Sequence, residues 1–165
     1  MNHNCVVVAG GSRARFFTLR DSEFPEMESG PNLHEIADLV SPEKDLPGSD
    51  LWTNLKSGRN RGGGGSPAHG YDDHRSQHQN ELERRFARDI AHEVARLMAT
   101  NATRELVLVA QTRVLGFLRH ELHSLLKAGV EIRELAKDLS KLSPLELHEH
   151  LARERLIPER RTPAG

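Results

Sequence analysis

Two runs of five consecutive apolar residues, at positions 5–9 and 106–110, place the strongest constraint on the fold of this chain. Both are rich in valine or leucine and bounded by polar residues or glycine, which is typical of strands buried on both faces. Burial on both faces requires helices above and below the sheet, so the runs predict an α/β fold. Both runs are far shorter than the roughly 20 apolar residues of a membrane-spanning helix.

Shorter patterns predict the other strands and two long helices. Strands are expected at 14–19, after a turn at residues 10–12, at 34–40 and at 130–135. Apolar residues three and four apart predict a helix that begins with an N-cap at Asp72 or Asp73 and ends near residue 101. A second helix is predicted at about 115–126, with Gly129 as its C-terminal glycine.

The clearest local signal lies near the C-terminus. Ser143 and Glu146 have the spacing of a capping box, and Pro144 occupies the first helical position. Leu142 and Leu147 are spaced for the hydrophobic staple that accompanies such a start. These residues predict a last helix that runs to about residue 155.

The order of the elements predicts the topology. Two strands joined by a short glycine turn form an antiparallel hairpin, and the later alternation of helix and strand favours parallel pairing. The prediction is a mixed five-stranded sheet of order 3-2-1-4-5 with helices on both faces, a ribonuclease-H-like architecture. The length of 165 residues fits one domain, at 1–157, with a disordered tail at 158–165. A long flexible glycine-rich loop is expected at 41–72.

Neither the carboxylates nor the glycines indicate an enzyme. Two-metal phosphodiester cleavage needs several carboxylates at strand ends, but residues 5–12 hold no Asp or Glu, and the strand at 106–110 leads into Gln111, Thr112 and Arg113. The turn at 10–12 lacks the lysine of a phosphate-binding loop and precedes a strand rather than a helix. The sequence therefore predicts no catalytic residue, no enzymatic activity and no cofactor.

Metal and thiol chemistry receive little support. His74 and His78 lie four residues apart beside Asp72 and Asp73, a spacing that places two imidazoles on one helix face as a zinc site needs. The alternative, a polar helix end, is favoured, and no metal is predicted. The single cysteine, Cys5, excludes an internal disulfide and is expected to pack in the core.

Two arginines follow strands that the predicted topology makes neighbours. In the 3-2-1-4-5 order, the ends of strands one and four flank the switch point where open sheets tend to bind ligands. Arg13 and Arg113 could both lie there and form an anion crevice. The alternative is that both arginines are simply solvated.

Charge is uneven along the chain although the net charge is only −1. Residues 21–50 carry nine acidic residues against one lysine, whereas residues 56–88 carry seven basic residues against four acidic ones. A basic glycine-rich loop that leads into an arginine-bearing helix could follow a phosphate backbone. The candidate RNA-binding residues are Lys56, Arg59, Arg61, Gly62, Gly63, Gly64, Gly65, Arg75, Arg84, Arg85 and Arg88.

Several segments resemble, in order, the bacterial family of proteins required for attachment to host cells. These are VVVAGGSRARFF at 6–17, ERRFARDIA at 83–91, ELVLVA at 105–110, LGFLR at 115–119 and KDLSKLSP at 137–144. Together they extend over nearly the whole chain. The family name describes a phenotype and implies no chemistry.

This family is similar in turn to the middle domain of archaeal and eukaryotic class-one release factors. That domain has a ribonuclease-H-like sheet and a Gly-Gly-Gln loop that helps to release the peptide at the ribosome. Here the corresponding residues, 61–66, read RGGGGS and no glutamine follows the glycines. Gly10 ends the first strand, where we expect Asp in many relatives. The resemblance implies contact with RNA, and the missing glutamine argues against peptide release, although the sequence leaves open whether the loop keeps any hydrolytic role.

The resulting expectation is a non-enzymatic cytoplasmic protein, without membrane insertion, that binds the ribosome or structured RNA through the basic loop. The alternative is a protein–protein interaction module in attachment, which would bind through the acidic stretch at 21–50 or through helical faces. The sequence leaves the oligomeric state and the physiological partner open.

Overall fold

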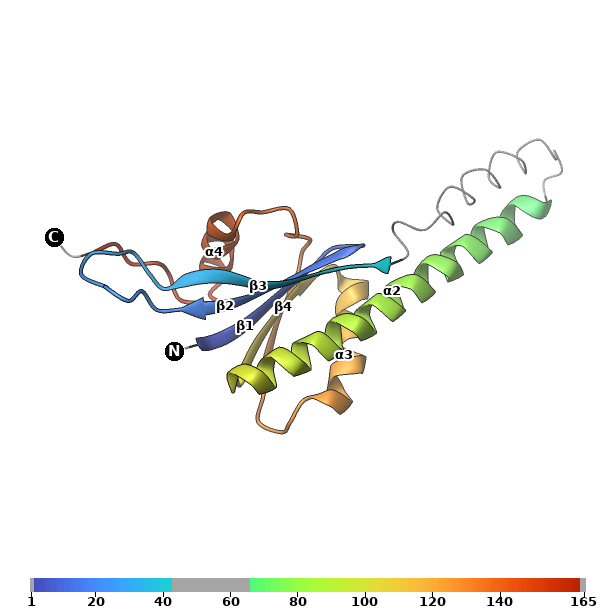
Figure 1. Ribbon diagram of the computed structural model, residues 1–165. Helices are drawn as coiled ribbons and strands as arrows, with labels where there is room; N and C mark the ends of the chain where they lie inside the picture. Colours follow the sequence, from blue (N-terminus) through green and yellow to red (C-terminus); the bar gives the residue numbers. More distant parts are fainter. Residues whose placement is uncertain (1, 43–65, 164–165) are drawn as a thin grey trace.

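The computed structural model describes residues 2–42 and 66–163, with side chains described at 4–42 and 74–163. Figure 1 shows a sheet with helices on both faces and one helix much longer than the others. The elements in chain order are β1 (Asn2–Ala9), β2 (Arg13–Arg20), β3 (Asn32–Val40), α2 (Ser66–Asn101), β4 (Glu105–Ala110), α3 (Thr112–Leu125), β5 (Glu131–Ala136) and α4 (Pro144–Arg153).

The sheet has the predicted order, β3-β2-β1-β4-β5. The β1/β2 and β2/β3 pairs are antiparallel, while β1/β4 and β4/β5 are parallel. The two apolar runs form the adjacent strands β1 and β4, with Val6 beside Val107 and Val8 beside Val109. The predicted α/β, ribonuclease-H-like arrangement is confirmed.

The side chains of β1 alternate between two apolar layers. Cys5, Val7 and Ala9 pack with the buried faces of α2 and α3, while Val6 and Val8 pack with α4. In Figure 1, α2 and α3 accordingly lie on one face of the sheet and α4 on the other. Every side chain of this run is at most 2% exposed, which explains why the strand is apolar throughout.

Helix α2 begins earlier than the sequence analysis predicted. It starts at Ser66, so residues 66–72 are helical rather than part of the expected loop at 41–72, and neither Asp72 nor Asp73 is the N-cap. The first turns contain no apolar stripe, because this part of the helix does not contact the sheet. Periodicity therefore could not reveal them. The remainder of the predicted loop, from residue 43 to residue 65, lies outside the described residues.

The observed ends of α3 and α4, and the C-terminal tail, also differ from the predictions. Helix α3 ends at Leu125, so Gly129, with φ of 93°, lies in the following turn rather than at the helix end. Helix α4 begins with the predicted capping box and ends at Arg153, two residues before the expected end. The predicted disordered tail is corrected at Arg161, whose backbone exchanges two hydrogen bonds with Gly30, of 2.8 and 3.1 Å.

Candidate functional site

The N-terminal part of α2, residues 66–85, projects beyond the sheet (Figure 1); we call it the projecting half of α2. All side chains from residue 74 to residue 79 are exposed. The first fully packed residues are Phe86 and Ala87, at 3% and 0% exposure, followed by Ile90 and Ala91. The sheet therefore anchors only the C-terminal half of this helix.

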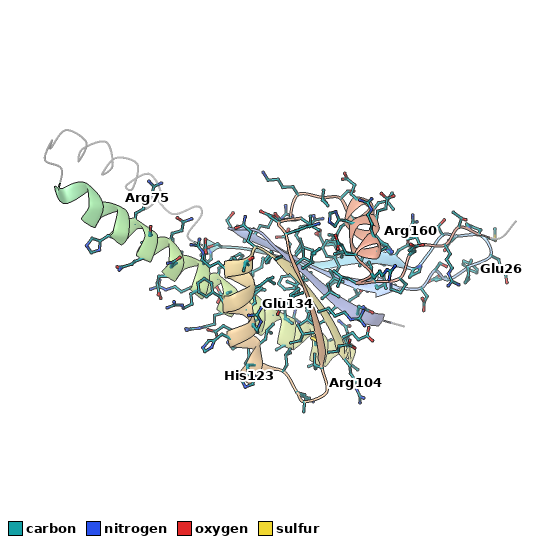
Figure 2. The ribbon with its side chains drawn as sticks, turned by 180° about the vertical axis from the view of Figure 1, so that it is seen from behind. Glu26, Arg75, Arg104, His123, Glu134 and Arg160 are labelled. Atoms are coloured by element: carbon teal, nitrogen blue, oxygen red, sulfur yellow. The ribbon has the colours of Figure 1, made fainter. Side chains whose placement is uncertain are left out.

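Four candidate RNA-binding arginines lie on α2. Arg75 is exposed on the projecting half, far from the body of the molecule in Figure 2, and forms no ion pair with any described residue. Arg84 and Arg85 both approach Glu81, at 3.7 and 3.4 Å, and Arg88 approaches Glu121 at 3.8 Å. Three of the four guanidinium groups thus already face a carboxylate.

These ion pairs are solvent-exposed and weak. The arginine side chains are 53–60% exposed, and such pairs contribute about 0–1 kcal/mol each. Arg84 also lies over the ring of Phe117, 5.4 Å from its centroid, which links α2 to α3. The other candidates, Lys56, Arg59, Arg61 and the glycines at 62–65, lie outside the described residues.

The two arginines of the predicted anion crevice are not brought together. Arg13 pairs with Asp38 of β3. Arg113 donates two hydrogen bonds of 2.8 Å to Glu83 of α2. Arg13 lines a cavity at the carboxyl end of β1, but Arg113 is not part of its wall. Each arginine therefore ties neighbouring elements together through an acidic partner.

The cavity at the carboxyl end of β1 has a volume of about 690 Å³. The turn at 10–13 forms one wall, and the segment from Asp138 to Ser143 forms the other. Arg15, which is 8% exposed, connects β2 to the second wall. Its guanidinium group pairs with Glu35 and donates hydrogen bonds to the carbonyl oxygens of Ser140 and Leu142. Its guanidinium carbon lies 5.0 Å from the centroid of the Phe17 ring.

Gly10 allows this wall to form. A Cβ atom at that position would lie 2.7 Å from Ser140 Oγ and 3.2 Å from Ser140 Cβ. The Ser140 hydroxyl is itself directed by a 2.6 Å hydrogen bond to Asp138 Oδ1. The close approach explains why a glycine follows β1.

The histidines of α2 and the single cysteine are not grouped into a site among the described residues. His74 and His78 are exposed on the projecting half of α2. Within the described ranges, no group of three or more His, Cys, Asp or Glu side chains is placed to hold a metal ion. Cys5 packs in the core as predicted, and burial raises the pKa of its thiol to about 12.

Sequence reasoning missed the burial of His148 in α4. This side chain is 2% exposed, and its Nε2 atom lies 2.9 Å from the carbonyl oxygen of Pro158. His148 stands four residues before Ala152 and one after Leu147, within the apolar stripe of α4. That spacing was a usable signal, because a polar residue inside an apolar stripe requires a partner in the interior.

Within residues 2–42 and 66–163, no helix combines the length and the apolar character needed to cross a membrane.

Comparison with known proteins identifies the family. No curated protein matches the chain. A solved structure described as an archaeal protein is 9% identical, with a TM-score of 0.38, and the match covers 92% of this chain but only 38% of that one. The release-factor relationship therefore stays a prediction. The sequence profile of the family "Protein required for attachment to host cells" matches residues 5–151. The chain belongs to this host-attachment family.

Proposed function

We propose that this chain is a non-enzymatic binding module that contacts structured RNA, including that of the ribosome, through the projecting half of α2 and the basic segment before it. The observation that carries the proposal is the length of α2: 36 residues, of which the first 20 precede the first fully packed residue, Phe86. A helix that extends beyond the core it packs against exposes polar surface and buries no further apolar area. A binding partner therefore best explains why the projecting half of α2 is present.

The chemistry of the partner follows from the basic residues. Arg75 forms no ion pair among the described residues, and the carboxylates facing Arg84, Arg85 and Arg88 hold them weakly. A phosphate backbone can replace such partners, since guanidinium groups bind phosphate oxygens in bidentate geometry. Lys56, Arg59 and Arg61 add three positive charges just before the helix.

Salt-dependent binding to ribosomes tests the proposal. Purified chain would be sedimented with ribosomes, and its affinity for a structured RNA measured by fluorescence anisotropy, between 50 and 200 mM salt. The double variant R59Q/R61Q should bind more weakly and with a flatter salt dependence, because fewer counterions are released.

The matched control is R104Q/K127Q, which removes two exposed basic residues at the other end of α2 and after α3. It should behave as the parent chain. Equal affinity and an equal salt slope for R59Q/R61Q and the parent would reject the RNA-binding surface.

A second candidate, a protein-binding module in attachment, is favoured by a different surface. Phe24 and Met27, in the β2–β3 connection, are 58% and 79% exposed among the acidic residues Glu23, Glu26 and Glu28. Aromatic and methionine side chains are enriched at protein interfaces. The variant F24S/M27S should reduce adhesion of expressing cells to host cells if this surface binds a partner, and leave RNA affinity unchanged.

A further inference from the structure

The β2–β3 connection, residues 21–31, displays the two most exposed large apolar side chains of the described residues. Phe24 is 58% exposed and Met27 is 79% exposed, whereas the next, Leu145, is 50% exposed and lies on α4. Phe24 and Met27 share one turn, because the N–H groups of Met27 and Glu28 both donate to the Phe24 carbonyl oxygen, at 2.9 and 2.7 Å. Apolar side chains scattered singly over a surface need no explanation, but these two lie together. The connection is therefore a candidate interaction surface.

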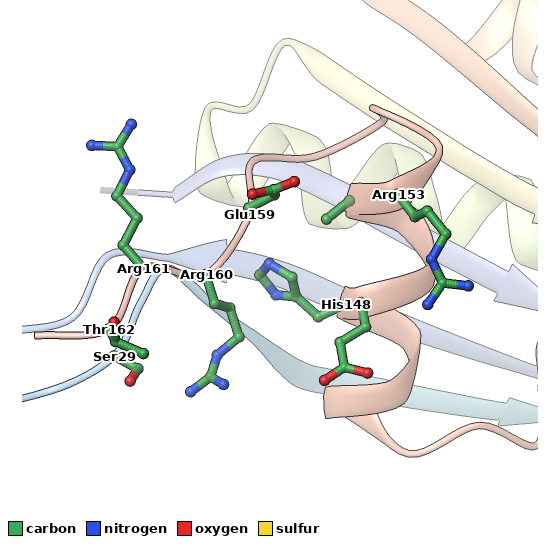
Figure 3. A pocket seen from close by; sticks show the side chains of 9 residues that line it. Ser29, His148, Arg153, Glu159, Arg160, Arg161 and Thr162 are labelled. Atoms are coloured by element: carbon green, nitrogen blue, oxygen red, sulfur yellow. The ribbon is translucent and has the colours of Figure 1, made fainter.

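The connection is held in place from both of its ends. A Cβ atom added to Gly30 would lie 3.0 Å from Ser22 Cβ, so the two ends of the connection pack closely against each other. The Gly30 backbone exchanges two hydrogen bonds with Arg161. Figure 3 shows Ser29 beside Thr162 of the C-terminal segment, and both side chains line one cavity. The turn that carries the two apolar side chains thus has an ordered support, so binding there costs little conformational entropy.

A cavity of about 760 Å³ lies beside this turn, between the connection and the C-terminal segment at 158–162. Pro25 and Glu28 of the turn both line it. Its larger apolar lining residues are Leu19, Pro25, Pro31 and Pro158, and its charged ones are Asp21, Glu28, Glu159 and Arg161. The cavity thus combines apolar walls with three acidic side chains and one basic side chain.

The connection is also strongly acidic. Residues 21–31 hold four acidic residues and no basic one. Among these, Glu23, Glu26 and Glu28 are exposed and form no ion pair with any described residue. Figure 2 shows Glu26 at one end of the molecule and Arg75 at the other, so the projecting half of α2 does not neutralise this surface.

An apolar surface with unpaired carboxylates selects a partner that is both apolar and cationic. Lysine and arginine side chains meet both needs, since their aliphatic stems cover apolar surface while their charged heads pair with carboxylates. A cation over the Phe24 ring gains further attraction. The phosphates of RNA would be repelled by the same carboxylates, so this surface does not extend the proposed RNA-binding surface.

We propose that the β2–β3 connection and the cavity beside it are the docking site for a basic, amphipathic segment of a partner protein. The large apolar side chains of that segment contact Phe24 and Met27, and its lysine or arginine side chains pair with Glu23, Glu26 and Glu28. The inference rests on the second candidate function, the protein-binding module, and specifies the chemistry of its partner. It does not depend on RNA binding by α2.

The test selects a random-peptide library, displayed on phage, on the full chain and measures the affinity of enriched peptides by fluorescence anisotropy. Enriched peptides should contain more lysine and arginine, and more large apolar residues, than the starting library. F24S/M27S should weaken their binding about tenfold, because it removes the apolar anchors of the surface. E26Q/E28Q should weaken binding about threefold or more and flatten its salt dependence, because it removes two of the carboxylates that pair with the peptide.

The matched control is D89N/E131Q, which removes two exposed carboxylates on α2 and on β5, the strand at the far edge of the sheet from β3. It should bind the peptides as the parent chain does. All the substituted positions are exposed, so folding is retained. No enriched peptide, enrichment of acidic or uncharged peptides, or an E26Q/E28Q variant that binds as the parent would overturn the proposal.

The adhesion assay separates this inference from the function on which it rests. If F24S/M27S reduced adhesion while no basic peptide bound, the protein-binding surface would stand and the partner chemistry proposed here would be wrong. If basic peptides bound as expected and F24S/M27S left adhesion unchanged, the docking site would stand and its role in attachment would be rejected.

Discussion

At the scale of single residues, Gly10 is the described glycine at which an added Cβ would make the closest contact, 2.7 Å. In G10A the new Cβ would displace Ser140, either moving its Cβ or breaking the bond from its hydroxyl to Asp138. Such overpacking costs about 1–3 kcal/mol, so urea unfolding should show a loss of that size. G11A is the matched control, since nothing lies within 4 Å of its new Cβ. Equal losses of unfolding free energy in G10A and G11A would contradict the close approach of Gly10 to Ser140.

His148 makes the stability of the fold sensitive to acid. Its pKa is lowered from 6.5 by burial and by Arg160, against the opposing effects of the Pro158 oxygen and Glu149. The unfolded chain therefore binds more protons below pH 6.5, and the free energy of unfolding should fall as the pH decreases through that value. In H148Q this part of the dependence should disappear between pH 7.5 and pH 5.

The control for that measurement is H123Q, at an exposed position of α3. It should keep the acid sensitivity of the parent chain. An H148Q variant with the same pH dependence as the parent would show that the buried imidazole does not titrate differently in the folded and unfolded chains.

At the scale of elements, the capping box of α4 is a separable contribution. Ser143 Oγ accepts from the Glu146 backbone N–H at 3.2 Å, and Glu146 accepts from the Ser143 N–H at 3.1 Å. S143A should lower the free energy of unfolding by about 1 kcal/mol, the usual cost of a lost N-cap. The Ser143 backbone N–H, and to a smaller extent the Ser143 hydroxyl, lower the pKa of the Glu146 carboxyl. S143A removes only the hydroxyl, so it should raise this pKa part of the way in an NMR titration.

Ser124 provides the comparison for the cap. It is an exposed serine in the last turn of α3, where no N–H needs its hydroxyl. S124A should change the stability by less than about 0.5 kcal/mol. If S143A were equally neutral, the cap would contribute nothing to stability.

The two helix starts show what the sequence could and could not reveal. Helix α4 was predicted closely because its capping box and its apolar stripe coincide in sequence. Helix α2 also has a Ser-Pro pair at its start, Ser66 and Pro67, yet its first helical residue was predicted seven or eight residues too late. The prediction followed apolar periodicity, which reports contact with a core, and the side chains at 74–79 are all exposed.

At the scale of the whole molecule, strand order was predictable and side-chain pairing was not. Apolar runs and turn lengths fix which strands are central and which pairs are antiparallel. The partners of Arg13 and Arg113 depend instead on which acidic residues the folded chain brings near. Asp38 is 25 residues away along the chain and Glu83 is 30, so no local pattern indicated either ion pair.

The two apolar layers should unfold together, because β1 contributes alternate side chains to both. Leu147, 0% exposed, packs only in the α4 layer with Val6 and Val8. Truncation of a buried leucine to alanine costs about 2–5 kcal/mol. In L147A, hydrogen exchange of the α2 amides at 86–98 should therefore accelerate by the same factor as that of α4, although these amides lie on the opposite face.

L118A makes the reciprocal test, since Leu118 is equally buried but packs only with the α2 and α3 layer. It should weaken the protection of α4 amides just as L147A weakens that of α2. If each variant accelerated hydrogen exchange only on its own face of the sheet, the two layers would unfold independently. Strand β1 would then separate the layers without coupling their stabilities. Equal effects in both directions mean that a partner bound on one face stabilises the other, since binding to the folded state raises the free energy of every global opening.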